Sequence, residues 1–84
     1  MSNVKMQAIS NNPSTNTVLA LAEVSTQLAQ TPEELHQQLE NIQSDVGLVI
    51  ITSGLAAKCE GIIESYRVKN QQPLIVVIPD PEEV

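Results

Sequence analysis

The chain has 84 residues, and its ten acidic side chains outnumber its four basic ones, which gives a formal net charge of −6 at pH 7. A chain of this length forms one small domain, residues 1–84, that buries roughly 60–65% of the surface of its unfolded state. The acidic balance argues against nucleic acid as a partner, because binding to phosphates requires basic side chains. The sequence also lacks Trp and Phe, which form the usual stacking platform of single-strand binders.

The cysteine content and the N-terminal sequence indicate the compartment. Cys59 is the only cysteine of the sequence, so no disulfide forms within the chain. The first ten residues, MSNVKMQAIS, contain no long apolar segment of the secretory kind. The most apolar run, residues 46–52, is shorter than the roughly 20 residues that cross a bilayer. We therefore expect a cytoplasmic protein without membrane insertion.

The N-terminal part predicts a strand, a helix and a second strand. Residues Val4–Ile9 alternate apolar and polar side chains, as a strand does, and the turn formers Ser10–Pro13 follow them. Ser14 or Thr15 is suited to cap the helix that comes next. Its apolar positions, at i, i+3 and i+4, are Val18, Leu21 and Ala22. A weak strand is expected at residues 25–29.

The start of the second helix is the clearest boundary in the sequence. Thr31 can cap it, Pro32 suits its first position, and Glu34 stands three residues after Thr31, which completes a capping box. A narrow apolar stripe then follows at spacings of four and three residues: Leu35, Leu39 and Ile42.

The C-terminal half predicts two strands buried on both faces and one helix between them. Residues 46–52 and 73–79 are almost continuously apolar, as strands of a parallel sheet are. Ser53 can cap the intervening helix, in which Gly61 suggests a close approach to the sheet. The wide apolar face of this single helix consists of Leu55, Cys59, Ile62, Ile63 and Tyr66.

The order β-α-β-α-β-α-β predicts an α/β fold with three α-β-α layers, of the Rossmann or flavodoxin-like kind. Right-handed crossovers favour a four-stranded parallel sheet in the order 2-1-3-4. The carboxyl edge of such a sheet would bring residues 53–54 beside residues 10–12 and 79–80.

The carboxyl edge shows no pattern of catalytic residues. No glycine-rich phosphate loop follows any predicted strand, and a helix cap explains Ser53 better than an anion site does. Cys59 falls on an apolar helix face, which predicts a buried, inert thiol. His36 has no second histidine or nearby cysteine with which to hold a metal. We expect no catalysis, no cofactor, no metal and no small-molecule ligand.

Four segments, TNTVLALAEV, TPEELHQQLENI, DVGLVIIT and PLIVVIPD, occur in an order that resembles the F subunits of the vacuolar- and archaeal-type (V/A-type) rotary ATPases. The resemblance covers roughly residues 4–79. It implies a non-catalytic protein of the central stalk, which docks on the rotor shaft and turns with it. In that role the protein couples ATP hydrolysis or synthesis to ion transport, and it is peripheral to the membrane.

The chain departs from the family pattern at several positions. Ser10 and Asn11 replace Gly-Asp after the first strand, and Ser53 replaces an acid. The family pattern continues into a C-terminal helix on the shaft, whereas the printed sequence ends at Val84. Without that helix, we expect either one face of the last strand or the carboxyl edge near Thr52, Pro79 and Asp80 to lose its cover. The exposed Val and Ile side chains would then form an association site.

A protein partner, either the shaft subunit or a second copy, is therefore expected at the carboxyl edge. Residues 80–84 form an acidic tail at the rim of this interface. The candidate interface residues are Thr52, Ser53, Pro79, Asp80, Glu82 and Glu83. Two alternatives stay open: a free-standing α/β protein that self-associates or binds another protein, and a small ligand-binding or enzymatic domain.

Overall fold

Strands and helices alternate along the computed structural model, which describes residues 5–22, 24–43, 45–70 and 73–80. The elements in chain order are β1 (Lys5–Ser10), α1 (Pro13–Leu21), β2 (Ser25–Leu28), α2 (Pro32–Glu40), β3 (Val46–Thr52), α3 (Ser53–Lys58), α4 (Glu60–Lys69) and β4 (Leu74–Ile78). The start of the first predicted strand, Val4, lies outside the described residues. None of the described helices is long and apolar enough to span a bilayer.

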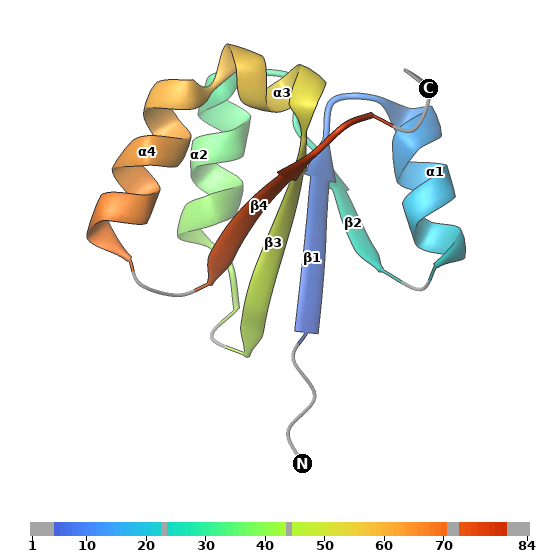
Figure 1. The fold of residues 1–84 in the computed structure, drawn as a ribbon, viewed down its shortest axis with the longest axis horizontal. Coiled ribbons are helices and arrows are strands. Elements are labelled where there is room, and N and C mark those ends of the chain that lie inside the picture. The colour runs from blue at the N-terminus through green and yellow to red at the C-terminus, as the bar shows by residue number, and fades with distance from the viewer. Residues whose placement is uncertain (1–4, 23, 44, 71–72, 81–84) are drawn as a thin grey trace.

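The four strands form a parallel sheet in the order β2-β1-β3-β4, which confirms the predicted topology. In the register of the sheet, Ile51 of β3 lies beside Ile9 of β1 and Val77 of β4. Figure 1 shows α1 on one side of the sheet and α2 and α4 on the other, with α3 above the ends of the strands. The three predicted layers are therefore present.

The hydrophobic core lies almost wholly on the side of α2 and α4. Strand residues of this face, such as Val49, Ile51 and Ile75, alternate with residues that point to the opposite face of the sheet. The helices contribute Leu35 and Leu39 from α2, Leu55 and Ala56 from α3, Cys59, and Ile63 from α4. On the other face, by contrast, α1 buries only Thr15 of its own side chains.

The predicted capping box of the second helix is present. The Thr31 hydroxyl accepts a hydrogen bond from the Glu34 N–H at 3.1 Å, and Glu34 Oε1 accepts one from the Thr31 N–H at 3.2 Å. Glu34 Oε1 also accepts from the Gln30 N–H at 2.8 Å. Three N–H groups at the start of α2 are therefore satisfied by side chains.

The prediction for the first helix was wrong in its cap and in its buried face. Asn12 is the N-cap and accepts from the Ser14 N–H at 2.9 Å, so neither Ser14 nor Thr15 caps the helix. Val18 is exposed, and Leu21 is 82% exposed. Thr15 is instead the α1 side chain that is buried, so the helix packs with a different face than its apolar spacing predicts.

The single helix predicted after β3 is divided in two at Cys59. The backbone of this residue, with φ −130° and ψ 28°, lies outside the helical region. The break lets both α3 and α4 bury apolar side chains, although their axes differ. The prediction for Gly61 was also wrong, because a Cβ atom added there would meet no neighbouring atom within 4 Å.

Cys59 is buried as predicted, with 2% of its surface exposed. Burial raises the pKa of its thiol, so the thiolate fraction is small at neutral pH. We expect a bulky maleimide to label Cys59 at least about tenfold more slowly in native protein than in denaturant. The Ser65→Cys variant places a second thiol at an exposed position of α4 and should gain one fast label. Equal native rates at the two thiols would contradict the burial of Cys59.

The edge of β4 is partly protected by a side chain from α4. Arg67 Nη2 donates a hydrogen bond to the main-chain carbonyl of Ile75 at 3.0 Å, while its Nη1 contacts Glu64 Oε1 at 3.2 Å. β4 lies at one edge of the sheet. Arg67 therefore occupies a main-chain acceptor of an edge strand.

Candidate functional site

The carboxyl edge of the sheet brings residues from three parts of the chain together, as the predicted topology requires. A Cβ atom added to Gly54 would lie 2.8 Å from Asp80 Oδ2 and 3.6 Å from Asn11 Oδ1. The residues after β1, β3 and β4 are therefore neighbours at this edge. In parallel α/β sheets, this is where ligands usually bind.

Asp80 closes the start of α3. Its Oδ2 accepts a hydrogen bond from the Gly54 N–H at 3.0 Å, and the residue is only 7% exposed. Thr52 is the N-cap residue of this helix but makes no side-chain cap hydrogen bond. The prediction that Ser53 caps the helix was therefore wrong, since a carboxylate 26 residues farther along the chain satisfies the helix N–H.

The turn after β1 is held by its own side chains. The buried Ser10 hydroxyl lies 2.8 Å from Asn16 Oδ1 and accepts from the Asn12 N–H at 3.2 Å. Asn16 Nδ2 in turn donates to the Gln27 carbonyl of β2 at 3.2 Å. These polar groups connect β1, α1 and β2, which is a structural use of them.

The six predicted interface residues have different surroundings. Thr52 and Asp80 are buried within the chain, and their place in an interface stays a prediction. Asp80 is also not part of a solvated acidic tail. Ser53 is half-buried and Pro79 is exposed. The rest of the predicted tail, which includes Glu82 and Glu83, lies outside the described residues.

The chemistry available at this edge is limited. Asp80 Oδ1 and Thr52 Oγ1 are buried and have no hydrogen-bond partner among the described residues. Neither is paired with a histidine, lysine or cysteine that could activate it. In the described part of the chain, no three His, Cys, Asp or Glu side chains come together as metal ligands would. The arrangement suits a rigid end of the sheet better than it suits a reaction.

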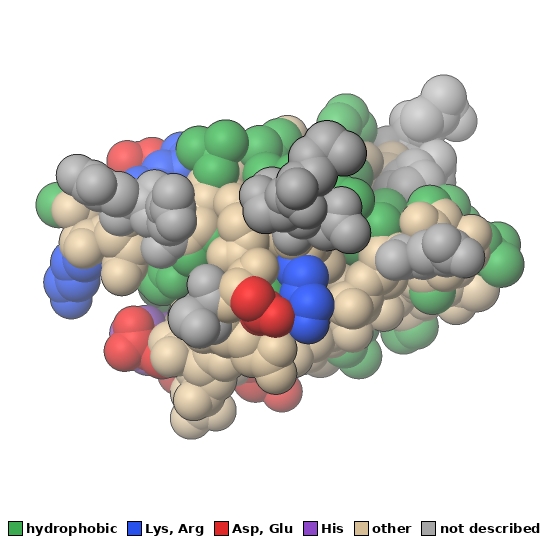
Figure 2. All heavy atoms as spheres, turned by 90° about the horizontal axis from the view of Figure 1, so that it is seen from below, with side chains coloured by type: hydrophobic (Ala, Val, Ile, Leu, Met, Phe, Trp, Pro, Cys, Tyr) green, Lys and Arg blue, Asp and Glu red, His purple; other side chains and the backbone are tan. Residues whose placement is uncertain are grey.

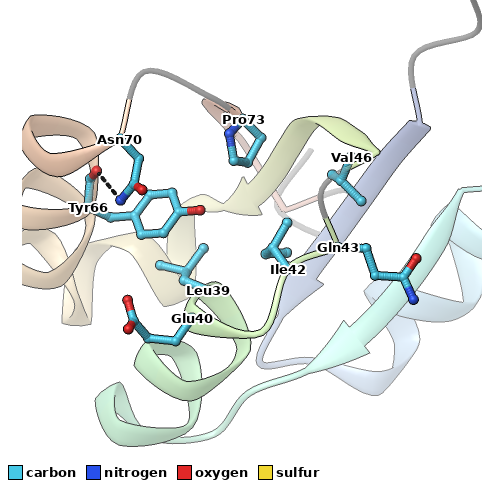
Figure 3. Close-up of a pocket in the computed structure, with 8 residues that line it drawn as sticks. All are labelled: Leu39, Glu40, Ile42, Gln43, Val46, Tyr66, Asn70 and Pro73. Carbon is cyan, nitrogen blue, oxygen red and sulfur yellow. Dashed lines mark hydrogen bonds between the residues drawn. The ribbon is translucent and has the colours of Figure 1, made fainter.

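A groove between α2 and α4, at the opposite end of the sheet, encloses about 330 Å³. Figure 3 shows the Tyr66 ring pointing from α4 toward Leu39, with Asn70 beside it. Burial, and to a smaller extent the Glu40 carboxylate, raises the pKa of the Tyr66 phenol. A phenol with a raised pKa stays protonated at neutral pH and is a poor general base.

On the other face of the sheet, α1 packs on β1 and β2. Within the described part of the chain, no helix packs on the half of this face that β3 and β4 form. We call this area the open half-sheet. Exposed apolar side chains were predicted on the last strand but not on β3. The apolar side chains of this area are exposed or half-buried, and Met6 lies at its border. They are Met6, Leu48, Ile50, Leu74, Val76 and Ile78. Leu74 is the most accessible of them, at 63%.

Charged side chains are concentrated on the opposite side of the molecule. α1, β2, β3 and β4 contain none, and the charged residues of the described part lie in α2, α3 and α4 except for Lys5, Asp45 and Asp80. Figure 2 shows acidic and basic side chains on the left and in the centre, and hydrophobic ones on the right and along the upper margin. Lys5 Nζ lies 2.8 Å from Asp45 Oδ2, and the hydrogen bond between them lowers the pKa of Asp45.

Comparison with known proteins agrees with this description. Six chains of solved structures match significantly, and one of them is the F subunit of the V-type ATP synthase of Archaeoglobus fulgidus. It is 22% identical, with a TM-score of 0.65 over 90% of the present chain and 99% of its own, which shows a shared fold. No curated protein matches significantly. The sequence model for the ATP synthase (F/14-kDa) subunit matches residues 6–84, and the chain therefore belongs to the family of ATP synthase F subunits.

Proposed function

We propose that the protein is a non-catalytic subunit of the central stalk of a V/A-type ATP synthase. In this role it docks on the rotor shaft, turns with it and couples ATP hydrolysis or synthesis to ion transport. The observation that carries the proposal is the family match, which spans residues 6–84. The working complex lies at the membrane, with this subunit on the cytoplasmic side.

The surface of the domain supports a role in binding proteins. Some of the polar groups of the carboxyl edge are used in internal hydrogen bonds, such as that of Asp80 Oδ2 with the Gly54 N–H. The open half-sheet instead exposes several large apolar side chains, as Leu74 illustrates. Exposed apolar patches on small domains mark surfaces of association. A subunit that transmits torque needs such a surface and requires no catalytic group.

Reconstitution tests the proposed function. The chain and its cognate shaft subunit, mixed at micromolar concentration, should sediment as a one-to-one complex. An ATP synthase assembled without the chain should hydrolyse ATP with little ion transport, and addition of the chain should restore transport. The chain alone should show no ATP hydrolysis. Absence of binding to the shaft subunit, together with unchanged coupling, would refute the proposal.

The open half-sheet also favours a second candidate, the free-standing module that associates with itself. A face of apolar side chains without charge can pair with its own copy in a symmetric dimer. Sedimentation, with and without the shaft subunit, distinguishes the two. The second candidate predicts a stable dimer that ignores the shaft subunit, whereas the first predicts a monomer that binds it.

A further inference from the structure

The groove between α2 and α4 continues beyond the part drawn in Figure 3, toward the N-terminal ends of both helices. This second part encloses about 380 Å³ and shares Leu39, Glu40, Tyr66 and Asn70 with the first part. We call the two parts together the α2–α4 groove, and all of its lining residues belong to the described part of the chain. Tyr66 and Ile62 pack against the hydrophobic core but are only half-buried. The groove therefore has an apolar floor that is still accessible.

The α4 wall of the groove contains a glycine that the packing of the chain does not require. A Cβ atom added to Gly61 would meet no atom within 4 Å, so neither α2 nor the sheet needs a small residue there. Glycine is nevertheless less favourable than alanine inside a helix. Ser65, another small residue that lines the groove, follows four residues later on the same side of α4. The open space above Gly61 therefore suits the close approach of a partner's backbone.

The α2 wall of the groove is acidic. Glu33, His36 and Glu40 are spaced three and four residues apart, which places them on one flank of α2. The Glu40 carboxylate lies near enough to the Tyr66 phenol to contribute to its raised pKa. Within the described part of the chain, neither Glu33 nor Glu40 forms an ion pair. A free carboxylate beside an aromatic ring is a suitable site for a cationic side chain.

The charge of the groove favours a basic partner over a second copy of the chain. A symmetric dimer through this surface would bring two acidic α2 walls into one interface, and each copy could offset them only with Lys69, the basic residue of the α4 wall. A partner that carries Lys or Arg would instead pair with Glu33 and Glu40. Amphipathic helices commonly dock in grooves of this kind, with their apolar face on the floor. The surface therefore fits a helix that has one apolar stripe and a basic flank.

We propose that the α2–α4 groove docks a basic amphipathic helix of the shaft subunit. The apolar stripe of that helix covers Ile62 and Tyr66, its backbone passes over Gly61, and one of its basic side chains pairs with Glu40. This inference rests on the proposed function, because the occupant that it names is a segment of the proposed partner. It also explains why α4 has a glycine where the chain alone leaves room for a larger side chain.

Leucine substitutions on two neighbouring helices test the role of the glycine. Gly61→Leu fills the open space in the groove, whereas Ala57→Leu adds a leucine side chain at an exposed position of α3 outside it. We expect the Kd for the cognate shaft subunit to rise at least about tenfold for Gly61→Leu and to change less than about twofold for Ala57→Leu. In urea, Gly61→Leu should unfold at the same or a higher midpoint than the original chain, because leucine is the better helix former. A glycine with a purely structural role would not lower affinity while stability is kept.

Two substitutions that each remove one negative charge test the acidic wall. Glu40→Gln changes the groove, whereas Glu64→Gln changes the far flank of α4, where Glu64 contacts Arg67. At low ionic strength the Kd should rise about three- to tenfold for Glu40→Gln and less than about twofold for Glu64→Gln. Added salt should weaken the binding of the original chain more than that of Glu40→Gln, since salt screens the ion pair.

A measurement on the unaltered chain makes the test independent of any variant. Tyr66 is the only aromatic residue of the sequence, so its ring gives a single set of NMR signals when only this chain is isotope-labelled. On addition of the unlabelled shaft subunit, these ring signals should shift. The methyl signals of Leu21, which is exposed on α1 on the other side of the sheet, should keep their positions.

The outcomes separate this assignment from the proposed function. If the chain binds the shaft subunit, but Gly61→Leu and Glu40→Gln bind equally well and the Tyr66 signals stay unchanged, the assigned surface is wrong and the proposed function stands. A loss of binding confined to Leu74→Asp, on the open half-sheet, would have the same meaning. If the unaltered chain does not bind the shaft subunit, the proposed function fails and this assignment fails with it. Tyr66 signals that shift with the concentration of the chain alone would replace the shaft helix with a second copy.

Discussion

Replacement of Ile51 by alanine is expected to lower the free energy of unfolding by about 2–5 kcal/mol. Ile51 lies on the inner strand β3, between Ile9 and Val77 in the register, and it is fully buried. Alanine removes buried apolar surface and leaves a cavity, because the surrounding sheet cannot collapse onto it. A domain of 84 residues is stable by only about 4–13 kcal/mol. The variant should therefore lose a large fraction of its stability.

Urea denaturation, followed by circular dichroism, measures this change. Leu21→Ala removes a leucine side chain that is mostly in water and should change the stability by less than about 0.5 kcal/mol. Ile51→Val should cost about 0.5–1.5 kcal/mol, between the other two variants. Equal losses for Ile51→Ala and Leu21→Ala would show that the core is not centred on this face of β3.

Gly54→Ala is expected to destabilise the protein by about 1–3 kcal/mol, and to do so only while Asp80 is present. The added Cβ atom would come within 2.8 Å of Asp80 Oδ2, so the carboxylate must move away from the Gly54 N–H. A hydrogen bond to a charged group contributes about 1.5–3 kcal/mol. In the Asp80→Ala background the obstacle is absent, and alanine should instead stabilise the helix by up to about 1 kcal/mol.

A double-mutant cycle with these two substitutions gives the interaction directly. The free energies of unfolding of the original chain, both single variants and the double variant should yield a coupling of at least about 1 kcal/mol. Asp80→Ala alone should cost about 1–3 kcal/mol, since the Gly54 N–H loses its partner. Additive effects of the two substitutions would mean that Asp80 does not hold the start of α3.

Features determined by neighbouring residues could be predicted from the sequence. The capping box depends on residues 31–34 alone, and its two hydrogen bonds have the predicted partners. The sheet order follows from the alternation of elements and the hand of the crossovers. The continuous apolar run of residues 46–52 places β3 inside the sheet, where it has a neighbour on each side.

Features determined by packing were not predictable in the same way. The spacing of Val18 and Leu21 predicted that these two side chains form the buried face of the first helix. In the structure, the buried side chain of α1 is Thr15. The break at Cys59 has no glycine or proline to mark it. The hydrogen bond of Asp80 with Gly54 joins residues 26 positions apart, and the sequence between them contains no sign of it. The open half-sheet depends on the number of helices that each face receives, which is a property of the whole fold.

The contact of Arg67 with the Ile75 carbonyl has a consequence for solubility. The strand LIVVI is uncharged, rich in β-branched residues and located at an edge, which are the properties of segments that seed fibrils. Its exposed main chain would otherwise present acceptors to the same strand of another molecule. The guanidinium occupies one acceptor and holds a positive charge there, while Pro73 and Pro79, which have no N–H to donate, stand at the two ends. These features reduce the number of main-chain groups of β4 that are available for stacking into cross-β aggregates.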